Sequence, residues 1–217
     1  MKSVTRKIGN EGFSPKLAKT SQVSPLKIVA IGASTGGPQA LHAILQQLPA
    51  NFPAPILCVQ HISEGFLQEL VNWLAAECSI HITIAQPGDF PQPGTVYFAP
   101  EEKHLQLDAL GRFLTTSTPA VSSHRPSITV LFQAVAGCYG PSTVGILLSG
   151  MGRDGAEGLQ AIAQAGGVTI AQNEQTCVVF GMPKEAIALG AAQYILPIHE
   201  IAPMLLYRML TVVIDDC

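Results

Sequence analysis

The sequence has no apolar run long enough to cross a membrane. Glycine, proline or charged residues interrupt each apolar stretch before the roughly 18 residues that a spanning helix needs. The basic N-terminal segment also lacks the apolar core, about 7 to 15 residues long, of a secretory signal. The sequence therefore predicts a soluble, cytoplasmic protein with no direct insertion into a membrane.

Cysteine pairs are missing too. The five cysteines are odd in number and include no C-x-x-C pair, so their spacing indicates neither a disulfide framework nor a zinc site. We expect them to be core or surface thiols in a reducing compartment. No other pattern for a metal ion or an organic cofactor is present, and the sequence predicts that none is required.

Charge is sparse and uneven. Charged residues make up 12% of the chain and the formal net charge is -3. The first 25 residues hold five basic residues and one acidic residue, a charge of +4, which leaves -7 for the remainder. No general attraction to nucleic acid is expected from this balance. Residues 1–26 are predicted to be a basic linker or tail, disordered or loosely packed.

Apolar strands alternate with amphipathic helices through residues 27–210, which we expect to form one domain. Such alternation predicts an α/β fold, a doubly wound and mainly parallel sheet flanked by helices, because parallel strands need crossover helices. Three short strand candidates within residues 94–117 predict a small antiparallel patch. Helices are expected near residues 41–48, 67–74, 128–135 and 156–165, with terminal helices from about Pro183 and His199.

One glycine-rich run, Gly32-Ala33-Ser34-Thr35-Gly36-Gly37, directly follows the predicted strand at 28–31. Its first five residues fit G-x-S-x-G, in which glycines let the backbone turn sharply and lift a nucleophilic serine clear of the sheet. The same outline of strand, glycine loop and helix also binds phosphates, because a helix N-terminus offers unpaired N–H groups. The run alone supports both classes of function.

Three reactive side chains lie at or just after the ends of three predicted strands: Ser34, His61 and Asp154. Sites in such sheets form beyond the carboxyl ends of the strands. A serine hydroxyl needs a base to take its proton, and imidazole, with an unperturbed pKa of about 6.5, is suited to this. A carboxylate behind the imidazole would fix its tautomer. The alternative role of Asp154 is the N-cap of the following helix.

The segment His124-Arg125-Pro126-Ser127 holds the other histidine in a loop position suited to catalysis. Ser127 is predicted to cap the next helix, and Arg125 to bind a carboxylate or carbonyl of a substrate. A plain helix entry is the alternative interpretation of this segment.

A dinucleotide site lacks two of its usual parts. The loop does not follow G-x-G-x-x-G, and Gln60-His61 stands where an acidic residue would grip a ribose. A Walker A phosphate loop lacks its Lys-Ser or Lys-Thr pair. The order of Ser34, His61 and Asp154 also differs from the order in α/β-hydrolases.

Several motifs occur in one order along the chain: Ile31 to Gly37, Gln60-His61, Phe98-Ala99-Pro100 with Lys103-His104, His124 to Ser127, Ser149 to Ala156, and Ala171 to Glu174 with Phe180 to Pro183. From about Lys27 to Leu206 they resemble the catalytic domain of the chemotaxis protein-glutamate methylesterase family, CheB. The resemblance implies hydrolysis of γ-glutamyl methyl esters on the cytoplasmic helices of chemoreceptors, with release of methanol, and deamidation of receptor glutamines in many relatives.

The resemblance also implies roles for residues. Ser34 would be the nucleophile, His61 the general base and Asp154 the orienting acid. We expect the backbone N–H of Thr35 to hold the oxyanion, with a second amide at Met151 or Gly152. The alternative is that the glycines of these two loops serve only the geometry of the turns.

The sequence departs from the family pattern in two places. The usual N-terminal receiver domain is not found in this chain, which suggests a separate regulatory protein as a partner, and Ile62 to Gly65 replaces the Met and Pro of many relatives. Two other functions stay open: a dinucleotide-binding oxidoreductase, and a non-catalytic receptor-binding module.

Overall fold

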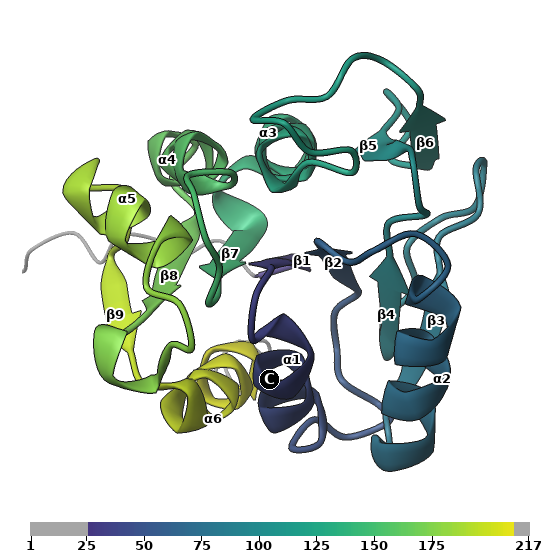
Figure 1. The fold of residues 1–217 in the computed structure, drawn as a ribbon. Coiled ribbons are helices and arrows are strands. Elements are labelled where there is room, and N and C mark those ends of the chain that lie inside the picture. The colour runs from purple at the N-terminus through teal and green to yellow at the C-terminus, as the bar shows by residue number, and fades with distance from the viewer. Residues whose placement is uncertain (1–25, 211–217) are drawn as a thin grey trace, which may run out of the picture.

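The computed structural model describes residues 26–210, so residues 1–25 of the predicted tail and Cys217 lie outside the described residues. Its main feature is a seven-stranded sheet in the order β3-β4-β2-β1-β7-β8-β9, and every neighbouring pair is parallel (Figure 1). The strands are β1 (Ile28–Ala33), β2 (Ile56–Gln60), β3 (His81–Ile84), β4 (Thr95–Phe98), β7 (Thr143–Leu147), β8 (Val168–Gln172) and β9 (Tyr194–Leu196).

A separate antiparallel pair is formed by β5 (His104–Leu107) and β6 (Phe113–Thr116). The predicted fold class is confirmed, but the antiparallel patch is smaller than the predicted range of 94–117. Thr95–Phe98 runs parallel to β2 and β3 within the main sheet instead. All four of its residues are buried, as expected for a strand covered on both faces.

Helices cover both faces of the sheet. In the view of Figure 1, α3 and α4 lie above the sheet and α1 and α6 lie below it. Each face has its own apolar core, and β1 contributes to both because alternate side chains point to opposite faces: Val29 and Ile31 to one, Ile28 and Ala30 to the other. The helices are α1 (Gly37–Leu45), α2 (Leu67–Glu77), α3 (Ile128–Tyr139), α4 (Ala156–Gln164), α5 (Met182–Ala188) and α6 (Ile198–Leu210).

The central strand β1 places the predicted site residues at one edge of the sheet. The chain continues from β1 to β2 on one side and later returns to β7 on the other. The register sets Ala33 opposite Gln60 and Gly32 opposite Leu147, so all three strands end at one level. The residues that follow them therefore emerge together at the switch point, where doubly wound sheets bind ligands.

No helix within residues 26–210 has the length and apolar character needed to cross a membrane. The four cysteines in this range are free thiols, as expected: Cys58, Cys78, Cys138 and Cys177. Burial raises the pKa of the Cys58 thiol, which is fully enclosed in β2, well above its ordinary value.

Candidate active site

Ser34 leaves the end of β1 in a tight turn that leads into α1. Its N–H donates to Ser149 O at 3.0 Å, and its carbonyl accepts from Gly37 N at 2.8 Å. Gly36 has a φ of 78°, a conformation that favours glycine. A Cβ at Gly37 would lie 1.9 Å from Gln60 Oε1, so only glycine lets the helix begin this close to the sheet. Both glycines thus serve to bring α1 directly behind Ser34.

Ser34 is half-buried. Within residues 26–210 its Oγ has no hydrogen-bond partner, and neither do the backbone N–H groups of Thr35, Met151 and Gly152. A Cβ placed on Gly150 would lie 2.7 Å from Ser34 Cβ, so the loop that carries Met151 and Gly152 runs against the serine. A free hydroxyl therefore lies beside a loop with free amide donors.

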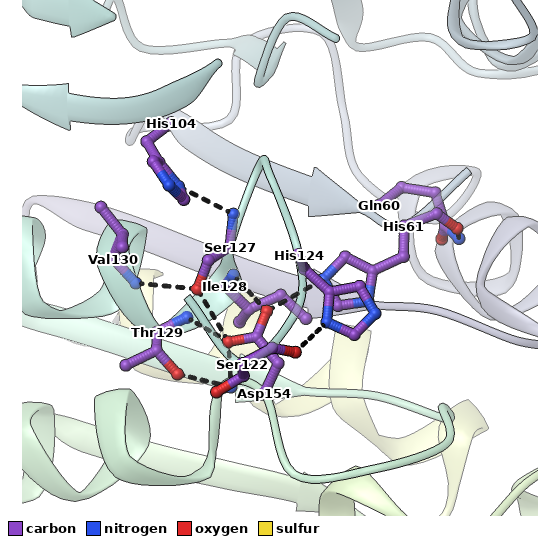
Figure 2. Close-up of polar contacts among 11 residues, drawn as sticks. Gln60, His61, His104, Ser122, His124, Ser127, Ile128, Thr129, Val130 and Asp154 are labelled. Atoms are coloured by element: carbon purple, nitrogen blue, oxygen red, sulfur yellow. Dashed lines mark hydrogen bonds and ion pairs between the residues drawn. The ribbon is translucent and has the colours of Figure 1, made fainter. Parts of the chain in front are cut away.

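His61 follows β2 and is tied to the same edge, because its N–H donates to Ala33 O at 2.9 Å. Its ring Nε2 is 2.9 Å from Asp154 Oδ2, a hydrogen-bond contact with a side chain that is fully enclosed (Figure 2). The other ring nitrogen, Nδ1, is buried and has no partner within the described residues. The imidazole is therefore held by one nitrogen, and the second is free to act as a base.

Asp154 lies at the N-terminus of α3, although the sequence places it before α4. Its carboxylate accepts from Ile128 N at 2.8 Å, from Thr129 N at 3.1 Å and from Ser127 Oγ at 2.8 Å (Figure 2). Gly155 is the N-cap of α4. Asp154 Oδ1 also accepts from Gly155 N at 3.0 Å, but the N-cap residue is Gly155, so the alternative prediction that Asp154 caps α4 is wrong. Most of the hydrogen bonds to Asp154 come from the start of α3, whose dipole favours negative charge there.

These contacts keep the Asp154 carboxyl ionised. Burial raises the pKa of Asp154, but the hydrogen bonds from His61, Ile128 and Ser127 outweigh burial and lower it to about 2. An ionised carboxylate can only accept hydrogen bonds. His61 Nε2 must therefore carry a proton, and Nδ1 is then the basic nitrogen of the neutral ring.

Ser127 and His104 form a second layer behind Asp154. Ser127 caps α3 as predicted, since its Oγ accepts from Val130 N at 3.4 Å while donating to Asp154. Its N–H donates to His104 Nδ1 at 3.2 Å. Both side chains are fully buried. Ser127 cannot reach a substrate, and this pair serves to hold Asp154 in place.

His124 stacks flat on His61, with ring centroids 3.7 Å apart and an interplanar angle of 4° (Figure 2). Together with Asp154, these rings offer three potential metal-ligating atoms within 4.8 Å of one another. The arrangement does not suit an ion, because lone pairs of two parallel rings do not converge on one point and Asp154 already accepts several N–H groups. The geometry fits a stacked imidazole pair.

Arg125 lies on the wall of an open hollow beside the loop that follows β2. Its Nη2 donates to Glu102 Oε2 at 2.8 Å, while its Nε is buried and has no partner within the described residues. Gln60, Ile62 and Pro126 also line the hollow. Arg125 thus lies next to His124 in the chain, on the wall of this hollow, and is held by an acidic neighbour.

Three contributors to the site were missed in the sequence. Gln60 Nε2 donates to Ser34 O at 2.9 Å and to His61 O at 2.7 Å, which joins the two loops. Ser149 Oγ donates to Thr35 O at 2.8 Å, and Ser149 N donates to Gln172 Oε1 at 2.8 Å. Polar residues at the ends of buried strands are the signal that could have identified them.

Comparison with known proteins finds a sequence family described as CheB methylesterase, whose model matches residues 29–205. A protein-glutamate methylesterase/protein-glutamine glutaminase 2 from Cupriavidus metallidurans is 43% identical over 207 residues, covering 94% of this chain and 61% of the relative. The protein-glutamate methylesterase FrzG of Myxococcus xanthus is 44% identical over 182 residues, covering 84% of this chain and 54% of the relative. The chain thus spans 54 to 61% of the length of these two relatives.

A solved structure is similar to this chain in both sequence and fold. The crystal structure of the Thermotoga maritima CheB methylesterase catalytic domain superposes with a TM-score of 0.81 at 40% identity. The match covers 83% of this chain and 97% of that chain. The similarity therefore extends over almost all of a catalytic domain.

Proposed function

The chain belongs to the CheB methylesterase family, and from this membership and the site geometry we propose that residues 27–210 form a serine hydrolase domain. Its substrates are γ-glutamyl methyl esters of chemoreceptors, and its products are methanol and glutamate. The observation that carries the proposal is the 2.9 Å contact between His61 Nε2 and Asp154 Oδ2 at the sheet edge where Ser34 emerges. Ser34 is the nucleophile, His61 the base and Asp154 the orienting acid.

The reaction has two halves. In the first, Ser34 Oγ bonds to the ester carbonyl carbon while its proton passes to His61 Nδ1, and the carbon–methoxy bond then breaks as His61 gives the proton to the departing methoxide, which leaves as methanol. In the second, a water loses a proton to His61 and attacks the acyl carbon, and the bond to Ser34 Oγ then breaks as His61 returns the proton to Oγ, which releases the glutamate side chain and restores Ser34. Asp154 stays ionised and stabilises the imidazolium that forms in both halves.

Backbone amides stabilise the negative oxygen of each tetrahedral intermediate. The Thr35 N–H is one donor, and the N–H of Met151 or Gly152 is the second. Support comes from the lack of any other acceptor for these groups within residues 26–210 and from the close approach of the two loops at Gly150. Donors that are fixed before reaction lower the barrier without reorganisation.

The partner is the cytoplasmic helical region of a methylated chemoreceptor, and the protein acts in the cytoplasm. Arg125, on the wall of the hollow beside the loop that follows β2, contacts a carbonyl or carboxylate of that helix. The same chemistry acts on receptor glutamines when the bond that breaks is the amide bond and the product that leaves is ammonia. A separate regulatory protein is proposed as a second partner. No role for nucleic acid is proposed.

The test is methanol release from a receptor methylated with a radiolabelled methyl group. We expect release by the parent protein above the spontaneous rate, and ammonia release from an otherwise identical receptor that carries glutamine at the same position. A parent protein that binds the methylated receptor but leaves its methyl groups in place would contradict a hydrolase and support the receptor-binding alternative.

The oxidoreductase alternative is tested by a fluorescence titration with NAD and NADP. We expect no saturable binding, because Gln60 and His61 occupy the end of β2 where a dinucleotide site needs an acidic residue. Saturable binding together with absent methanol release would favour the alternative.

A further inference from the structure

His124 is the one aromatic neighbour that covers a face of His61 in the described part of the chain. Its ring lies parallel to the His61 ring with centroids 3.7 Å apart (Figure 2). Within residues 26–210 the His61 ring has only one polar contact, between Nε2 and Asp154. A single hydrogen bond leaves rotation about that contact open, so the stacked ring supplies the missing restraint.

The turn that carries His124 is built to hold it. Val121 and His124 exchange two backbone hydrogen bonds, of 3.1 and 3.0 Å, across Ser122 and Ser123. Both serines have positive φ, at 52° and 66°, which side chains other than glycine rarely adopt. Strained positions of this kind gather at functional sites, where the surrounding structure enforces them.

The backbone of its own turn also holds the His124 ring. Its Nδ1 lies 2.6 Å from Ser122 O, and a carbonyl oxygen only accepts, so Nδ1 carries the proton. Asp154 is the charged group bonded to His61, and Arg125, next to His124, is paired with Glu102. The His124 ring, held by this contact, therefore lies on the base that Asp154 holds.

We propose that His124 is a positioning residue for the proton transfers of His61, an inference that rests on the proposed function. The stacked ring fixes the plane of His61, so that Nε2 stays on Asp154 while Nδ1 stays free to take the proton of Ser34. It also presents a π face to the imidazolium formed in each half-reaction, which favours the charged ring. No proton moves to His124, and no bond to it forms or breaks.

Two variants of His124 separate its flat ring from its other properties, because His124→Phe keeps a flat ring and His124→Ala removes it. The control is His81→Ala, which removes an exposed histidine of β3. We expect His124→Ala to lower kcat for methanol release about tenfold to a hundredfold, with KM within about twofold, because the base is misplaced while the substrate surface remains. His124→Phe should recover most of the loss, and His81→Ala should match the parent.

Nitrogen NMR of the His61 ring gives a readout that needs no substrate. In the parent and in His124→Phe, Nε2 should be the protonated nitrogen and Nδ1 the acceptor, whereas His124→Ala should show a mixture of tautomers. Equal loss of kcat in the Phe and Ala variants, or full activity and an unchanged His61 tautomer in the Ala variant, would overturn the positioning role. A parent that releases no methanol would instead overturn the proposed function.

Discussion

At the scale of single residues, Asp154 has the most contacts to explain. Its carboxylate receives hydrogen bonds from the first turn of α3 and from Ser127 as well as from His61. A group with this many donors is fixed in position and in charge. An amide in its place would present N–H groups to donors, so both the orientation and the tautomer of His61 depend on the carboxylate.

Asp154→Asn should therefore lose activity steeply. In serine hydrolases, the same change of the orienting carboxylate lowers turnover by on the order of 10⁴, because the imidazole adopts the wrong tautomer. We expect a similar loss in methanol release, and no loss in Asp89→Asn, which changes an exposed carboxylate far from the site in sequence. A near-parental rate for Asp154→Asn would remove Asp154 from the mechanism.

The lowered pKa of Asp154 also predicts a pH dependence of stability. The pKa falls from 3.8 to about 2 on folding, so the ionised group stabilises the protein above about pH 4 and its contribution is lost as the pH falls through 2. Between pH 5 and pH 3, the parent should lose about 1 kcal/mol more unfolding free energy than Asp154→Asn. Urea unfolding at both pH values measures this difference, and parallel losses in the two proteins would contradict it.

The common location of Ser34, His61 and Asp154 at one edge of the sheet could be predicted, because each follows an apolar strand and parallel strands end together. His61 and Asp154 are in contact as that reasoning requires. The stacking of His124 could not be predicted, because it depends on the path of a turn that returns over the sheet edge after a long segment. The attachment of Asp154 to α3 was missed for the same reason.

At the scale of elements, the junction between β1 and α1 sets the position of the nucleophile. A Cβ at Gly37 would lie 1.9 Å from Gln60 Oε1 and 2.9 Å from Ala33 Cβ. The Gln60 side chain cannot easily move aside, since its Nε2 donates to the carbonyls of Ser34 and His61. Any added atom at this junction must displace both loops.

Gly37→Ala is accordingly expected to lower the unfolding free energy by about 1 to 3 kcal/mol, as overpacking does, and to reduce methanol release through displacement of Ser34. The matched control is Gly137→Ala in α3, where a Cβ would meet nothing within 4 Å. That change should stabilise the helix by about 0.5 to 1 kcal/mol and leave activity unchanged. Thermal unfolding and a rate assay report both effects, and a stable, fully active Gly37→Ala protein would contradict this view of the junction.

Most elements were predictable from apolar periodicity, and the helices near 156–165 and from 183 and 199 lie within a residue or so of α4, α5 and α6. The strand at 95–98 was assigned to the wrong sheet, because a short apolar strand between proline-rich turns has the same local pattern in either sheet. Its neighbours β2 and β3 are brought beside it only by packing.

At the scale of the whole molecule, the site depends on the point where the strand order changes direction, between β2 and β7 on either side of β1. Ser34 follows the central strand, His61 follows its neighbour on one side, and Asp154 follows its neighbour on the other. The strand on one side of β1 thus leads to His61, and the strand on its other side leads to Asp154. The helices behind these strands fix the edge from both faces, and the second-layer contacts of Asp154 come from α3.

The most direct test of this account is the rate of methanol release by Ser34→Ala, measured beside Ser142→Ala. Ser142 precedes β7 and lies at the opposite end of the sheet from the site. We predict that Ser34→Ala releases methanol no faster than the uncatalysed ester hydrolyses, while Ser142→Ala equals the parent and both variants unfold like the parent. Undiminished release by folded Ser34→Ala would show that another group attacks the ester.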